Sequence, residues 1–352
     1  ELNHFKAGSN TFVFLPHSPF LFIAVSKSSL PVSYLFKQLN FLYYLFLSLF
    51  SENLINQLSM RPQSDFRQIA EGTKPAWDGV VNIMSDDPAF IFAPGVPTGY
   101  LPTEERQQVS RRLISLQNCI LSMLMYRNRV LAIGHNQCDP LSLRLIIDLA
   151  YTPAFQDTKG SDSWTPFFLR DSTDGMHHLY ISQHRSDEPF IVALSSDTQG
   201  LPPLHADSNQ ILQALSSIAP SLNKSVGWTP AEFKFWALNI PSHGQVFVTN
   251  PQSELPGGQD VNAWMKDIRQ ELAKSYDMVY ENGSEGEFLF RGEANVVVVN
   301  KTSSMEFYAI ASSKDLPNRS LSEKINELKN FVTSNIGDFI ISDTKISVPK
   351  LV

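Results

Sequence analysis

Hydrophobic positions recur along this chain with two periods, one typical of strands and one typical of helices. The C-terminal third shows the pattern most clearly. Two alternating segments, Lys234–Ile240 and Gln245–Thr249, flank the turn Pro241–Gly244, which predicts a β-hairpin. Large apolar residues then recur at every fourth position within Asp260–Val279, which predicts a helix with one apolar face. Three further strands are predicted at Gly286–Arg291, Asn295–Asn300 and Met305–Ala311.

Two details sharpen this prediction. Val296 to Val299 form a continuous β-branched run, which is typical of a central strand buried on both faces. Ser320 and Glu323 have the spacing of a capping box, so Ser320 is the predicted N-cap of a helix that runs through Phe331. The predicted order of elements is therefore β-β-α-β-β-β-α.

The middle third repeats this order at an offset of about 115 residues, with almost no residue identity. Such a match in element order indicates a shared fold rather than a short tandem repeat. The predicted elements are a hairpin (Cys119–Tyr126 and Arg129–Gly134), a helix (Asp139–Leu149), three strands (Trp164–Leu169, His178–Gln183 and Phe190–Leu194) and a closing helix (Asp207–Ile218).

The N-terminal part shows only the second half of such a unit. The predicted elements are strands at Thr11–Leu15 and Leu21–Ser26 and helices at Pro31–Leu58 and Phe66–Met84. Gly72 and Pro75 weaken the second helix. His4–Lys6 is interpreted as the remainder of a third strand. The hairpin and helix that open the other units are expected to be absent here.

These patterns predict an α+β chain of three domains, each an antiparallel five-stranded sheet with flanking helices, the first truncated at its N-terminus. We expect a partial first domain at 1–88, a second domain at 113–220 and a third at 232–352. Residues 89–112 are the expected linker between the first two, because Ala89–Pro102 is rich in proline. Leu222–Ala231 is a second, shorter expected linker.

Composition narrows the class of protein. The chain has 352 residues, of which 43% are hydrophobic and 18% charged, so it can bury proper cores. A net charge of −7 argues against nucleic-acid binding and against strong attraction to anionic lipid. Two cysteines, Cys119 and Cys138, indicate a reducing compartment without a disulfide framework. The apolar segment Tyr34–Phe50 is interrupted by Lys37 and Gln38, so we expect a buried helix rather than a membrane span.

No catalytic, cofactor-binding or metal-binding residues are predicted, and no cofactor is expected. The sequence has no Walker or Rossmann glycine pattern, and Gly283–Gly286 is interpreted as a plain turn. His177, His178 and His184 lack a zinc-ligand spacing and are expected at the surface. Trp164 is expected to be a packing anchor. A hydrolase with an unrecognised site, containing His178 or His184, remains an alternative.

Five short motifs of the chain match a known pattern. They are Phe5–Leu15, Leu21–Ser26, Arg61–Arg67, Met84–Phe90 and Ser163–Pro166. These motifs resemble those of the Mon (monensin-sensitivity) family, whose members form a guanine-nucleotide exchange factor with a Ccz subunit. The resemblance extends from about residue 4 to residue 195, and beyond that mostly the element order agrees.

The resemblance implies three longin/roadblock-like domains and a heterodimer with a Ccz-type longin subunit. The implied activity is guanine-nucleotide exchange on a late-endosomal or vacuolar Rab GTPase, in support of vesicle–vacuole fusion and autophagy. The chain would then act in the cytoplasm and associate peripherally with late-endosome or vacuole membranes. It would do no bond-making chemistry and would bind no nucleic acid. The alternative is a non-catalytic longin-domain scaffold in a trafficking complex.

His4, Phe5 and Lys6 are the predicted partner interface, because an edge strand left open by a missing hairpin invites pairing. In the Mon family the first longin unit meets the Rab, and this chain is expected to lack the first hairpin and helix of that unit. We therefore expect the chain to form the dimer and yet to exchange nucleotide poorly on its own.

Overall fold

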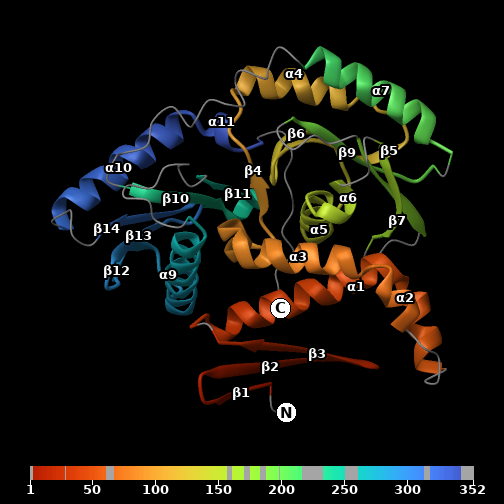
Figure 1. The fold of residues 1–352 in the computed structure, drawn as a ribbon. Coiled ribbons are helices and arrows are strands. Elements are labelled where there is room, and N and C mark those ends of the chain that lie inside the picture. The colour runs from red at the N-terminus through yellow and green to blue at the C-terminus, as the bar shows by residue number, and fades with distance from the viewer. Residues whose placement is uncertain are drawn as a thin grey trace.

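The computed structural model shows two sheets separated by a long helix (Figure 1). The small N-terminal sheet lies on one side of this helix, and the large sheet with its covering helices lies on the other. The structure describes residues 3–27, 29–60, 67–156, 161–169, 175–182, 188–197, 199–215, 233–249, 261–312 and 318–341.

The N-terminal sheet is an antiparallel meander in the order β1-β2-β3. The register pairs Phe5 with Phe12, and Phe14 with Ile23. The strand predicted at His4–Lys6 is confirmed as β1. The strands are β1 (His4–Ala7), β2 (Asn10–His17) and β3 (Phe20–Ser26).

Helix α1 (Val32–Met60) packs against both bodies of the molecule. Leu35 and Leu39 join Val13 in a small core under the N-terminal sheet, whereas Phe41 and Leu45 point into the main core. A helix with apolar residues on all sides is stable only when it is covered on all sides, which explains the hydrophobic run that resembles a membrane span. Among the described residues, no helix combines the length and the apolarity needed to cross a membrane.

Helix α1 is interrupted at Ser51, where the backbone has φ 60 and ψ 154. The chain then continues into two shorter helices. The break between these two helices lies at the Gly72–Pro75 stretch, where the sequence predicts a weakness. The helices are α2 (Arg67–Glu71) and α3 (Lys74–Asp86).

The described residues also form a mixed sheet of 11 strands in the order β12-β13-β14-β10-β11-β4-β6-β5-β9-β8-β7. Its two ends are antiparallel sets, β10–β14 and β5–β9, and each set has its own five strands in the same relative order. The strands are β4 (Val96–Thr98), β5 (Cys119–Tyr126), β6 (Arg129–Asn136), β7 (Ser163–Phe168), β8 (Met176–Ile181), β9 (Phe190–Ser195), β10 (Phe233–Ile240), β11 (Gln245–Val248), β12 (Gly286–Arg291), β13 (Asn295–Lys301) and β14 (Glu306–Ser312).

Helices cover both faces of this sheet. One face carries the main core, to which α1, α3, α5 and α9 contribute. The opposite face carries two separate cores, one under α10 and α11 and one under α4 and α7. The bounds are α4 (Thr103–Leu113), α5 (Pro140–Ala150), α6 (Pro153–Gln156), α7 (Leu201–Ala214), α9 (Val261–Asn282), α10 (Asn318–Ser334) and α11 (Ile336–Phe339).

Strand β13 shows how this layering follows from the sequence. Val297 and Val299 point into the main core, and Val296 and Val298 point into the core under α10. All four side chains are at most 2% exposed. The predicted central strand with two buried faces is confirmed, because alternate side chains of a strand face opposite sides of its sheet.

The proline-rich segment Ala89–Pro102, expected as a linker, forms defined elements instead of an irregular connection. Pro88–Phe92 is a 3-10 helix (η1), and the next residues form β4, whose side chains are buried. β4 pairs in parallel with β11 and with β6, so it joins the two five-strand sets. The division into domains at 88, 112, 220 and 232 stays a prediction.

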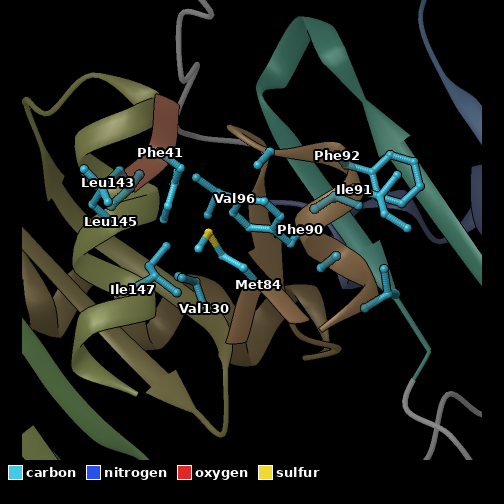
Figure 2. Packing of buried hydrophobic residues seen from close by; sticks show 14 of the residues in the cluster. Phe41, Met84, Phe90, Ile91, Phe92, Val96, Val130, Leu143, Leu145 and Ile147 are labelled. Atoms are coloured by element: carbon cyan, nitrogen blue, oxygen red, sulfur yellow. The ribbon is translucent and has the colours of Figure 1, made fainter. Parts of the chain in front are cut away.

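Large apolar side chains from several elements meet on η1 and β4 (Figure 2). Phe41 of α1 contacts Phe90 edge-to-face, with ring centroids 5.1 Å apart. Met84 and Val96 lie in the same cluster, and both are at most 2% exposed. Prolines suit this segment because their missing N–H groups leave fewer backbone donors to satisfy in an apolar interior.

A buried ion cluster fixes the start of η1. Asp87 accepts hydrogen bonds from both terminal nitrogens of Arg129, at 2.9 and 3.0 Å, and from Asn128. Arg144, whose side chain is fully buried, pairs with Asp148 at 2.9 Å and lies 3.7 Å from Asp87. Nη1 of Arg144 also donates to the carbonyl of Gly95. The cluster therefore ties η1 and β4 to α5 and to β6.

The two carboxyl groups respond differently to this environment. Burial raises the pKa of both, but for Asp87 the charges of Arg129 and Arg144 outweigh burial, so its pKa lies below the ordinary value. For Asp148 burial prevails over its pairing with Arg144, and the pKa is raised. Asp87 is thus the carboxylate that holds the two arginines.

Two helix boundaries differ from the prediction. α7 begins at Leu201 rather than at Asp207, because Pro202 and Pro203 are tolerated in a first helical turn. α10 begins at Asn318, so Ser320 lies inside the helix and is not its N-cap. The expected linker Leu222–Ala231 lies outside the described residues.

Replacing Asp87 by asparagine is expected to lower the free energy of unfolding by about 3 kcal/mol, because it leaves the buried charge of Arg129 without its carboxylate and removes one of the two carboxylates beside Arg144. Asp86→Asn is the matched control, since the neighbouring side chain is exposed, and it should change stability by less than about 0.5 kcal/mol. Urea unfolding of the three proteins measures both values. Equal stabilities would contradict the role given to Asp87.

The same pair of proteins should respond differently to acid. A carboxyl group with a lowered folded-state pKa stabilises the fold above its unfolded-state pKa of about 3.9, and this stabilisation is lost as the pH falls through the folded-state value. The stability advantage of the wild type over Asp87→Asn should therefore be constant from about pH 7 to pH 5 and shrink below about pH 4. Urea unfolding at several pH values tests this, and a pH-independent difference would contradict it.

Candidate partner-binding surface

The outer face of the N-terminal sheet exposes large apolar side chains. On β3, Leu21, Ile23 and Val25 are 55%, 51% and 57% exposed. Alternate residues of a strand share a face, so these three side chains form one row. The residues paired with them on β2 are Pro16, Phe14 and Phe12. We call the face formed by Phe5, Phe12, Phe14, Leu21, Ile23 and Val25 the outer face.

Aromatic rings extend this row across the sheet. The ring of Phe5 stacks on Phe12 at 4.7 Å and on Phe14 at 5.7 Å between centroids. Phe5 nevertheless remains 38% exposed. An aromatic ladder of this kind stabilises the pairing of β1 with β2. It also leaves ring faces exposed at the surface, where a partner can cover them.

The opposite face of this sheet is apolar as well. Val13, Leu15, Phe22 and Ala24 pack against α1. An antiparallel sheet with one covered face normally alternates apolar and polar residues, whereas here both faces are apolar. Contiguous exposed apolar surface of this kind marks interaction sites.

The strand order of the other units shows which edge is open. In both five-strand sets the last strand pairs with the first, β9 with β5 and β14 with β10. The strand that follows the helix, β7 or β12, lies at the end of the sheet. By chain order β3 corresponds to β9 and β14, and β1 corresponds to β7 and β12. Among the described residues no strand pairs with the outer edge of β3.

This comparison refines the predicted contact at His4, Phe5 and Lys6. The structure places all three on β1, and all three are exposed. Their contact with a partner stays a prediction. However, β1 corresponds to an edge strand in the other units, so the edge to which a hairpin would pair is that of β3.

The charge of the N-terminal sheet differs from that of the whole chain. Residues 3–27 contain Lys6, Lys27, His4 and His17 and no aspartate or glutamate, although the chain carries a net charge of −7. His17 stacks on Tyr43 of α1 at 3.6 Å between ring centroids, and burial lowers its pKa. The outer face is therefore apolar with a weakly basic rim, which suits a partner with acidic residues around an apolar patch.

The histidines of the middle unit are not at the surface. His177 and His178 lie on β8 and are 3% and 8% exposed, so the expectation of surface histidines is wrong for these two. Both faces of β8 are covered, which buries neighbouring residues alike. Trp164 stacks on His178 at 4.9 Å, as a packing anchor should. His184 lies outside the described residues.

The remaining candidate residues lie in buried positions or in a turn. Cys119 and Cys138 are free thiols, and burial raises their pKa values to about 11 and about 12. Within the part of the chain that the structure describes, no group of three or more His, Cys, Asp or Glu residues could hold a metal ion. Gly283 connects α9 to β12 with a positive φ of 65°, as expected of turn chemistry.

Comparison with known proteins shows which families the chain resembles. Residues 1–80 match the family described as the first longin domain of FUZ, MON1 and HPS1. The chain is 25% identical over 194 residues to the human vacuolar fusion protein MON1 homolog A. This match covers 52% of the present chain and 29% of the human protein. It is 25% identical over 192 residues to the Gallus gallus protein of the same name and 24% identical over 192 residues to the protein SAND of Takifugu rubripes. These two matches cover 34% and 36% of the relatives' length and 52% of this chain.

The matched part of the chain thus spans about a third of the length of these relatives. The N-terminal match coincides with β1–β3, α1 and the start of α3, which is where the outer face lies. The arrangement of sheets with helices on their faces is a longin-type α+β fold. On these matches the chain is similar to MON1-family proteins, and its residues 1–80 match a first longin domain of that kind.

Proposed function

We propose that this chain is a subunit of a heterodimeric guanine-nucleotide exchange factor for a late-endosomal or vacuolar Rab GTPase. It would bind a Ccz-type longin subunit through its N-terminal sheet. The observation that carries this proposal is the exposed apolar outer face, which lies within the residues that match a longin domain. The names of the relatives support a role in vacuolar fusion.

The proposal extends to the organisation of the chain. The sheet β1–β3 and the sets β5–β9 and β10–β14 would be three longin-type units. The assembly would work in the cytoplasm, peripherally on late-endosome or vacuole membranes, and would contribute to autophagy. The chain would be a regulatory subunit and would make and break no covalent bond.

Nucleotide exchange can be driven by the binding energy of a protein–protein interface, without catalytic side chains. An exchange factor must bind the nucleotide-free Rab better than the loaded Rab, because only differential affinity shifts that equilibrium. Accelerating release by about 10³ to 10⁵ requires about 4–7 kcal/mol of such differential binding. An interface of ordinary size can supply this energy through a few buried apolar and aromatic anchors. The outer face offers side chains of this kind.

The direct test uses a Rab loaded with fluorescent GDP. We expect the chain mixed with its Ccz-type subunit to accelerate release, and the chain alone to release nucleotide poorly. Rapid release by the chain alone would contradict the need for a partner. Binding of both proteins without release would instead favour the second candidate function, a longin-domain scaffold.

A point variant locates the dimer contact. Ile23→Lys places a charge in the centre of the outer face and should weaken binding of the Ccz-type subunit by about 10- to 100-fold, because it removes a buried apolar contact. It should change the stability of the free chain by less than about 1 kcal/mol, since Ile23 is half exposed. Isothermal titration calorimetry and urea unfolding measure the two effects.

Ile114→Lys is the matched control. Ile114 is 52% exposed and lies at the end of α4, away from the N-terminal sheet. This variant should bind the subunit as the wild type does. If Ile23→Lys also binds normally, the outer face is not the dimer contact and the proposal loses its main support.

A further inference from the structure

A pocket lies where the N-terminal sheet meets the rest of the molecule. It is an open cavity of about 330 Å³ between the end of β3, the start of α1, the end of α3 and α9. Its polar lining consists of Ser26, Lys27, Gln38, Ser85 and Arg269. None of its lining residues is an aspartate or a glutamate, in a chain that carries an excess of acidic residues.

Arg269 is the residue that gives this pocket its chemistry. The side chain projects from α9 and is only 8% exposed. Its Nε has no hydrogen-bond partner, and no carboxylate pairs with its guanidinium among the residues that the structure describes. The other deeply buried arginines behave differently, since Arg144 pairs with Asp148 and Arg106 donates to main-chain carbonyls.

A buried charge without a partner is costly, and proteins normally pair it or provide it with a ligand. The helix contacts on either side hold Arg269 in place. Ser29 donates to Gln270 at 3.0 Å, and Ser33 donates to Asp277 on the same helix. The unpaired guanidinium is therefore held at the pocket by packing that does not neutralise it.

We propose that this pocket binds the phosphate group of a small phosphate monoester. Two cationic side chains, Arg269 and Lys27, match the charge of a phosphate, which exceeds that of a carboxylate. Ser26, Ser85 and Gln38 add neutral donors for its remaining oxygens. The group would be carried by a soluble metabolite or by a lipid headgroup. The pocket borders the outer face at Val25, but the phosphate proposal does not depend on the dimer contact.

The test measures thermal unfolding of the full chain in inorganic phosphate and in chloride at equal ionic strength. Phosphate should raise the Tm of the wild type, because a ligand that binds only the folded state stabilises it by mass action. The Tm of Arg269→Met should not respond to phosphate. In chloride this variant should have a Tm equal to or above that of the wild type, because it removes an uncompensated buried charge.

Two further variants define the site. Lys27→Gln should weaken phosphate binding by about tenfold or more, since it removes one charged hydrogen-bond donor. Lys274→Gln, which changes an exposed lysine on the same helix, should leave binding unchanged. Equal phosphate responses in the wild type and Arg269→Met, or no response in the wild type, would overturn the proposal. A lower Tm of Arg269→Met in chloride would show that Arg269 has a structural partner and would also overturn it.

The source of the phosphate is distinguished by two arms. Glycerol phosphate is titrated against the chain in solution, and the chain is sedimented with phosphatidylcholine vesicles that contain or lack phosphatidic acid. Binding in the first arm alone indicates a soluble ligand, and Arg269-dependent sedimentation with phosphatidic acid indicates a lipid headgroup. Absence of Arg269-dependent binding in both arms contradicts the proposal. Neither arm involves a Rab or a Ccz-type subunit, so failure here leaves the exchange proposal standing.

Discussion

The carboxylate of Asp87 and the short strand that follows it hold the large sheet together. Asp87 pairs with Arg129 from the middle unit, and it lies beside Arg144, which in turn binds the carbonyl of Gly95. This places β4 between two antiparallel sets that would otherwise end in open edges. The side chain of Gln245 then ties the C-terminal segment to the same joint through two hydrogen bonds with Ile341. Without β4, the strands β11 and β6 would each form the edge of their own five-strand set and would expose a row of unpaired backbone groups.

Most of the regular elements could be predicted from periodicity alone, because the alternation of apolar and polar positions along a strand or a helix is local in the sequence. The strands at Cys119–Tyr126 and Gly286–Arg291 have the predicted bounds. The role of Ala89–Pro102 could not be predicted. Its proline content is typical of a connection, and its burial depends on pairing with β11, which lies far away in the sequence. Local patterns contain no information on such a contact.

The candidate surface was only partly visible in the sequence. Leu21–Ser26 was recognisable as a strand, and its lack of polar residues at alternate positions was the available signal that both faces are apolar. Which face α1 covers required the structure. Burial of His177 and His178 likewise depends on layers on both sides of β8. Arg269 becomes notable only because no aspartate or glutamate is among the described residues that line its pocket. A site that depends on the lack of acidic residues in its lining has no sequence motif.

The shared strand also has an evolutionary consequence. Proteins whose domains make few contacts with one another can gain or lose a domain by recombination, because each domain keeps its own contacts. Here β4 precedes the middle unit in the chain and yet completes the sheet of both units. Deleting or duplicating either unit would disrupt the pairing of β4 with β6 or with β11. One edge would then lose its backbone hydrogen bonds. Once this joint had formed, any change in the backbone of β6 or β11 had to preserve the pairing with β4.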